Sequence, residues 1–173
     1  IMSYLVRKAD IFLKEWKKNA DKYPLIIKGA RQVGKTETVR RFAKKNYKNI
    51  IEINFITDPA YKSIIEEGFS AESITKIISR IDPSKHFEVG ETLLFFDEIQ
   101  DFPEIATALK FFKEDGRYDV ICSGSLLGVQ YHRIASISVG YKTDYQMYSM
   151  DFEEFLWAKG YSDQIITELL EHM

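Results

Sequence analysis

The first segment of the chain that could do chemistry is rich in glycine. It reads GARQVGKT and matches the pattern G-x-x-x-x-G-K-[ST] with Gly29, Ala30, Arg31, Gln32, Val33, Gly34, Lys35 and Thr36. Glycines let a backbone curl so that its N–H groups point at an anion, and a helix that begins near Lys35 adds the positive end of its dipole. We expect Lys35 to reach the β- and γ-phosphates of a nucleotide and the Thr36 hydroxyl to bind Mg²⁺. Glu37 completes the predicted nucleotide-binding segment.

The second segment is an apolar run that ends in two acids, Leu93-Leu94-Phe95-Phe96-Asp97-Glu98. A buried strand of this kind would deliver Asp97 to the sheet edge, where the carboxylate could hold the magnesium shell. Glu98 is suited to orient or deprotonate an attacking water. Taken alone, such a run is more often a strand that leads into a polar turn, but beside a phosphate-binding loop it favours catalysis.

Two hydroxyls and two arginines leave alternatives open. Ser123 and Ser125 follow a third apolar run and could hydrogen-bond the γ-phosphate or the water, or could instead be turn or helix-cap serines. Arg31 could touch phosphate or a neighbouring acid, or could be solvated. Arg133 could act as a transition-state arginine in a neighbouring subunit.

Alternating strands and helices must position these groups. Short β-type runs cover residues 25–27, 50–55, 92–96, 118–121 and 143–147, and helical patterns cover residues 3–19, 36–43, 59–67, 74–81, 103–112, 152–156 and 165–170. Asp151 is expected to cap the helix at 152. This alternation predicts an α/β fold, a three-layer αβα sandwich around a parallel sheet, with ligands at the carboxyl ends of the strands.

A chain of 173 residues fits one domain with a small appendage. We expect a core over residues 1–150 and a helical segment over 151–173 that begins a lid or a C-terminal region. Because the chain starts with Ile1 ahead of Met2 and stops inside a helical pattern, we expect it to be part of a longer protein.

Composition favours an ordinary cytoplasmic protein. The net charge of −2 gives no support to nucleic-acid binding, although it does not exclude it. The basic cluster on the second helix is interpreted as a solvated face; it consists of Arg40, Arg41, Lys44, Lys45 and Lys48. The single Cys122 excludes an intrachain disulfide, the histidines show no metal-ligand spacing, and no apolar stretch approaches the roughly 20 residues of a membrane helix.

Four motifs carry a family resemblance. GARQVGKT, LLFFDEIQ, ICSGSLLG and YSMDFEEFLWAKG occur in this order and closely resemble prokaryotic AAA-type P-loop ATPases of the AAA+/STAND neighbourhood. The resemblance implies a P-loop NTPase sheet of order 5-1-4-3-2, with ATP and Mg²⁺ as ligands. It assigns Lys35 and Thr36 to phosphate and magnesium, Asp97 and Glu98 to the Walker B pair, and residues 123–125 to the sensor. In that family a C-terminal domain similar to nuclease-like folds follows, and we predict no nuclease activity for this chain.

Three functions follow from these motifs. The first is an Mg²⁺-dependent ATPase that switches an attached domain, such as its own C-terminal domain, or another protein; an oligomer is possible. The second is a P-loop small-molecule kinase, although Glu98 directly after Asp97 favours water as the acceptor. The third is a nucleotide-dependent interaction module with little or no hydrolysis.

Overall fold

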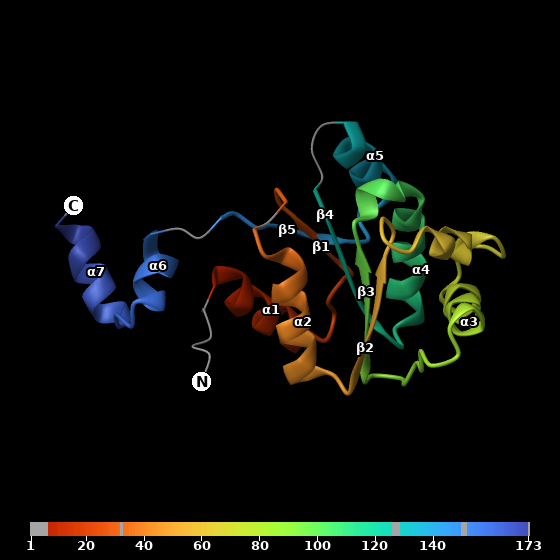
Figure 1. The fold of residues 1–173 in the computed structure, drawn as a ribbon, viewed down its shortest axis with the longest axis horizontal. Helices are drawn as coiled ribbons and strands as arrows, with labels where there is room; N and C mark the ends of the chain where they lie inside the picture. Colours follow the sequence, from red (N-terminus) through yellow and green to blue (C-terminus); the bar gives the residue numbers. More distant parts are fainter. Residues whose placement is uncertain (1–6, 32, 126–128, 150–151, 173) are drawn as a thin grey trace.

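A five-stranded parallel sheet forms the centre of the computed structural model, which describes residues 7–31, 33–125, 129–149 and 152–172 (Figure 1). From one edge to the other the strands are β2 (Asn49–Asn54), β3 (Thr92–Asp97), β4 (Asp119–Gly124), β1 (Leu25–Lys28) and β5 (Thr143–Gln146). Every pairing between neighbours is parallel. This arrangement confirms the predicted order 5-1-4-3-2.

Helices cover both faces of the sheet because successive strand residues point to opposite sides. Leu93 and Phe95 of β3 pack in the apolar cluster with α1 (Lys8–Lys18) and α2 (Lys35–Asn46). Leu94 and Phe96 pack in the opposite cluster, which includes residues from α3 (Ala71–Ile81), α4 (Ala108–Asp115) and α5 (Val129–Ile137). All four of these side chains are fully buried. The continuous apolar run of β3 is therefore a strand buried on both faces, as expected for a parallel sheet.

The register of the strands brings the candidate residues to one edge. Lys28, the last residue of β1, lies beside Gly124, the last residue of β4. Asn54 at the end of β2 lies beside Asp97 at the end of β3. The segments that leave these strands, including the glycine-rich loop, therefore begin at the same carboxyl edge, where open α/β sheets bind their ligands.

Several predicted helices differ in type from the structure. The helix expected over 59–67 is a 3₁₀ helix, η1 (Pro59–Ile65), and the helix expected from Pro103 divides into a 3₁₀ helix, η3 (Pro103–Thr107), followed by α4. A further short 3₁₀ helix, η2 (Ile99–Asp101), follows the two acids. Each of the two longer 3₁₀ segments begins at a proline, which has no N–H to donate into a helix. The helix α5 was not predicted.

The last two helices, α6 (Phe152–Ala158) and α7 (Asp163–Glu171), lie away from the layers of the sheet (Figure 1). Their exposed apolar side chains include Phe155, Tyr161, Ile165 and Leu169. Asp151, the predicted cap of α6, and residues 3–6 of the first predicted helix lie outside the described residues. Within the part of the chain that the structure describes, no helix has the length and apolar character needed to cross a membrane.

Candidate functional site

The glycine-rich loop joins β1 to α2, and its backbone requires glycine at two positions. A Cβ at Gly29 would lie 2.5 Å from the carbonyl oxygen of Met147, so the loop passes the end of β5 too closely for any side chain. Gly34 has φ +91°, a left-handed conformation that other residues rarely adopt, and it is the residue before α2. Gln32 lies outside the described residues. The loop therefore has the curled backbone that the motif predicts.

Lys35 lies over this loop rather than in solvent. Its Nζ donates hydrogen bonds to the carbonyl oxygens of Gly29 at 2.6 Å and Ala30 at 2.7 Å, and the residue is buried. Burial lowers the pKa of Lys35 from its usual value, and the carboxylates of Glu98 and Asp97 partly oppose this shift. A positive charge that is held by two carbonyls can be transferred to phosphate oxygens without leaving the loop.

Asp97 is the buried centre of the site. The Thr36 hydroxyl donates to Oδ2 of Asp97 at 2.7 Å, and the Ser123 hydroxyl donates to Oδ1 at 2.5 Å. Asp97 and Ser123 are 2% and 0% exposed. The adjacent hydroxyl and carboxylate oxygens of Thr36 and Asp97 fit Mg²⁺, which prefers oxygen donors and usually takes one or two protein ligands together with substrate phosphates. Ser123 fixes the orientation of the carboxylate from the side of β4.

Glu98 has an unusual backbone. Its φ of 57° and ψ of 48° place it in the left-handed region, where no other non-glycine residue among those described is found. Such strain costs about 1–3 kcal/mol and is found preferentially at functional sites. The Gln100 amide donates a short hydrogen bond to Oε2 of Glu98. Gln100 was not singled out by the sequence analysis, since a glutamine two residues after an acid carries no recognisable motif.

Gly124 makes room for Gln100. A Cβ at Gly124 would lie 2.5 Å from Oε1 of Gln100, so the end of β4 directly contacts this amide. Within the described residues, this Oε1 and the hydroxyl of Ser125 are buried without a hydrogen-bond partner. The structure thus separates the two candidate serines. Ser123 is bonded to Asp97, whereas Ser125 has an unused donor at the carboxyl edge of the sheet.

A cleft of about 570 Å³ brings most of the candidate residues together. Its walls come from the glycine-rich loop, the first two turns of α2, the segment after β2 and the end of β3: Arg31, Gly34, Lys35, Thr36, Glu37, Arg40, Asn54, Ile56, Thr57 and Glu98. Arg40, which the sequence analysis treated as part of a solvated cluster, lies on the cleft wall and is paired with Glu52 at 2.6 Å. Arg133 does not line the cleft; it pairs with Glu104 of η3 at 2.7 Å.

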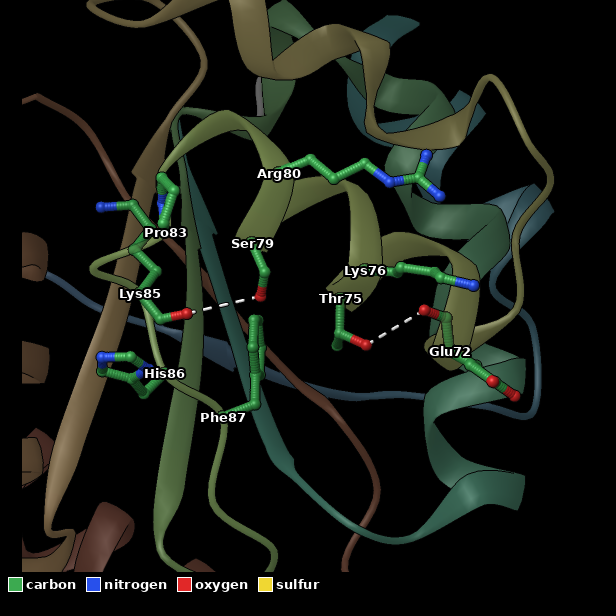
Figure 2. Close-up of a pocket in the computed structure, with 9 residues that line it drawn as sticks. All are labelled: Glu72, Thr75, Lys76, Ser79, Arg80, Pro83, Lys85, His86 and Phe87. Carbon is green, nitrogen blue, oxygen red and sulfur yellow. Dashed lines mark hydrogen bonds between the residues drawn. The ribbon is translucent and has the colours of Figure 1, made fainter.

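A second cavity, of about 640 Å³, lies beside α3 and the loop that follows it (Figure 2). Lys76, Arg80 and Lys85 contribute to its lining, and Phe87 forms part of its wall. Although this cavity has the larger volume, its walls contain none of the candidate residues. We therefore identify the functional site by its chemistry, in the cleft beside the glycine-rich loop.

Comparisons with known proteins agree with this geometry. A family model described as an AAA domain matches residues 21–156. Among solved structures, the chain is similar to C. elegans PCH-2 with a TM-score of 0.51 and 10% identity, over 82% of this chain and 41% of that chain. It is also similar to a chain in the structure of Drosophila ORC bound to DNA, with a TM-score of 0.48 and 9% identity over 84% and 94% of the two chains. No curated protein matches the chain. The likeness to PCH-2 concerns the fold alone.

Proposed function

Since the chain belongs to the AAA domain family, we propose that it binds ATP with magnesium, hydrolyses it, and thereby switches an attached domain or a partner protein. The observation that carries this proposal is the 2.7 Å hydrogen bond between Thr36 and Asp97, beside a cleft that Lys35 and Glu98 both line. A phosphate-binding loop, a magnesium-type oxygen pair and a carboxylate free to meet water are the parts that ATP hydrolysis needs.

Each residue has a separate role in this proposal. The backbone N–H groups of the loop and the N-terminus of α2 bind the phosphates, and Lys35 moves its charge from the loop carbonyls to the β- and γ-phosphate oxygens. Thr36 and Asp97 would hold Mg²⁺, and Ser123 keeps Asp97 in place through its hydrogen bond. When bound, the cation neutralises charge on the phosphate oxygens. Ser125 is assigned to the γ-phosphate, because its hydroxyl is the unpartnered one of the two.

Glu98 would act on the attacking water. The water oxygen forms a bond to the γ-phosphorus while the bond to the bridging oxygen of ADP breaks, and the Glu98 carboxylate orients the water and accepts its proton. Gln100 holds the carboxylate through one oxygen and leaves the other available. In this structure the strained backbone of Glu98 directs its side chain to the cleft wall.

Two other functions compete with hydrolysis. A small-molecule kinase would use the same loop and would place an acceptor hydroxyl where the water lies. An interaction module would bind nucleotide with little turnover. The position of Glu98 on the cleft wall favours hydrolysis over both, since neither needs a carboxylate that activates water.

Separation of labelled products tests the three functions together. The chain is incubated with γ-labelled ATP and Mg²⁺, with and without a mixture of hydroxylated small molecules, and the products are separated by thin-layer chromatography. Hydrolysis predicts free phosphate in both samples at the same rate. A labelled acceptor would instead indicate a kinase, and unchanged ATP in the presence of measurable binding would indicate an interaction module.

A further inference from the structure

A buried arginine contacts the glycine-rich loop from behind. Arg7, the residue before α1, donates from Nη1 to the carbonyl oxygen of Val33 at 3.1 Å and from Nη2 to the carbonyl oxygen of Tyr148 at 2.6 Å. Its Nε donates to Oε2 of Glu154 at 3.0 Å. Arg7 and Glu154 are 8% and 5% exposed. One guanidinium therefore joins the start of α1, the phosphate-binding loop, the segment after β5 and α6.

The position of this guanidinium relative to the loop is well defined. Nη1 lies 3.5 Å from where a Cβ of Gly34 would be, so Arg7 packs directly against the turn that leads into α2. Gly34 lines the nucleotide cleft, whereas Arg7 lines a separate small cavity of about 50 Å³ with the residues after β5. The loop backbone therefore has the cleft on one side and Arg7 on the other.

The geometry of the peptide bond gives this contact a consequence for phosphate binding. In a planar trans peptide the C=O of one residue and the N–H of the next point in opposite directions. The C=O of Val33 points to Arg7, so the N–H of Gly34 points away from Arg7, to the side on which the cleft lies. We propose that Arg7 is a positioning residue, which holds the Val33–Gly34 peptide so that the Gly34 N–H is available to a phosphate; this inference rests on the proposed function.

Glu154 keeps Arg7 in this orientation. Its Oε2 accepts hydrogen bonds from Nε of Arg7 and from the backbone N–H of Lys8 at 2.7 Å, which places the carboxylate at the start of α1. A buried arginine without a counter-charge is strongly unfavourable, so the pair acts as a unit. Because Glu154 lies on α6, any rotation of the Val33–Gly34 peptide on phosphate binding changes a contact of this helix. The same pair thus links the state of the phosphate site to the C-terminal helices.

Lysine cannot reproduce these contacts. The planar guanidinium has five donors in a rigid fork, and here the fork reaches a carboxylate and two carbonyl oxygens at once. A lysine ammonium carries the same charge at a single point. Arg7→Lys therefore separates a requirement for charge from a requirement for geometry.

The test compares wild type with the double variant Arg7→Met/Glu154→Gln, which removes both buried charges and so leaves neither one unpaired. The matched control is Arg117→Met/Asp115→Asn, which removes a 3.0 Å ion pair from the loop before β4. Affinity for Mg·ATP is measured by calorimetry, and the orientation of the Gly34 N–H is measured without nucleotide by residual dipolar couplings. We expect the first variant to lose on the order of tenfold in affinity and to change the Gly34 coupling while couplings in the strands stay the same. The control is expected to match wild type in both, and Arg7→Lys should resemble the first variant.

The outcomes distinguish this inference from the proposed function. If wild type binds ATP and the double variant binds it equally well, Arg7 does not position the phosphate site, although the proposed function stands. Full affinity in Arg7→Lys also overturns the inference, since charge alone would then suffice. If wild type binds no nucleotide, the proposed function fails, and the Gly34 coupling alone decides whether Arg7 holds this peptide.

Discussion

A carboxylate that activates water can be replaced by an amide of the same shape without loss of the surface that binds nucleotide. Glu98→Gln should therefore bind Mg·ATP within about twofold of wild type, while kcat falls by about 10²–10⁴, the usual contribution of a general base. Phosphate release under saturating ATP measures the rate, and calorimetry measures the binding. The control is Glu37→Gln, which changes an exposed glutamate on the wall of the same cleft. Equal rates in Glu98→Gln and wild type would move the activation of water to another residue.

The charge of Lys35 gives nucleotide binding a defined pH dependence. Burial lowers the pKa of Lys35 below its usual 10.5 in the free protein. Bound phosphates favour the charged amine, so binding takes up a proton once the pH exceeds the pKa of the free protein. Affinity is then constant below that pKa and declines above it, starting at a lower pH than an ordinary lysine would give. Calorimetry across the alkaline range tests this. Lys35→Arg, which stays charged, should show a flat profile, and a flat profile in wild type would contradict the assignment.

At the level of elements, the contact between β4 and η2 can be tested by adding one methyl group. Gly124→Ala would place a Cβ 2.5 Å from Oε1 of Gln100 and 3.3 Å from the backbone nitrogen of Ile99. We expect a loss of about 1–3 kcal/mol in the free energy of unfolding, measured with urea, together with reduced kcat because Gln100 must move away from Glu98. Adding Gln100→Ala should restore part of the stability and none of the kcat. Gly90→Ala, in open space, is the control and carries only the cost of a left-handed backbone, about 1–2 kcal/mol. Additive effects of the two substitutions would contradict the contact.

The elements that the sequence predicted well are those with a strong local signal. The apolar run Leu93–Phe96 and the glycine pattern around Lys35 are each sufficient to identify a strand or a turn, and the strand order followed from the resemblance. The helix α5 had no such signal, because its segment combines β-branched residues with serines and buries few side chains, chiefly Ile134. The 3₁₀ segments at Pro59 and Pro103 have helical spacing, which does not distinguish one helix type from the other.

Contacts between distant parts of the chain explain what the sequence could not predict at the site. Gln100 and Arg7 act through partners that lie close only in the folded chain: Gln100 meets Gly124, and Arg7 meets Glu154 147 positions away. Neither residue belongs to a motif with a fixed spacing. The predicted roles of Lys35, Thr36, Asp97 and Glu98 stay predictions, although the structure brings these four residues to one edge of the sheet.

For the whole molecule, the arginines on the cleft wall predict slow turnover by a single copy. Among the described residues, the arginines that line the cleft are Arg31 and Arg40, and Arg40 is already paired with Glu52. Arg133 is paired with Glu104. In P-loop enzymes an arginine supplied by a second protein contributes up to about 10³–10⁵ in rate. We therefore expect the rate per chain to rise with protein concentration.

Phosphate release over a hundredfold range of protein concentration tests this, with sedimentation velocity on the same samples to follow association. If Arg133 is the arginine supplied in trans, Arg133→Ala should remove the concentration-dependent part and leave ATP affinity unchanged. A rate per chain that is constant and already near the enzyme median of about 10 s⁻¹ would show that one copy has a complete site.

The central claim, that the cleft beside the glycine-rich loop binds Mg·ATP, is tested most directly by a calorimetric titration of wild type and Lys35→Ala. Lys35 holds the positive side chain of the loop, with Nζ 2.6 Å from the carbonyl oxygen of Gly29. Loss of one charge-assisted contact of this kind costs about 1.5–3 kcal/mol, or one to two decades in affinity. The account predicts one binding event per chain in wild type and a dissociation constant about 10–100 times higher in Lys35→Ala. Equal affinity in the two proteins, or no binding by wild type, would contradict it.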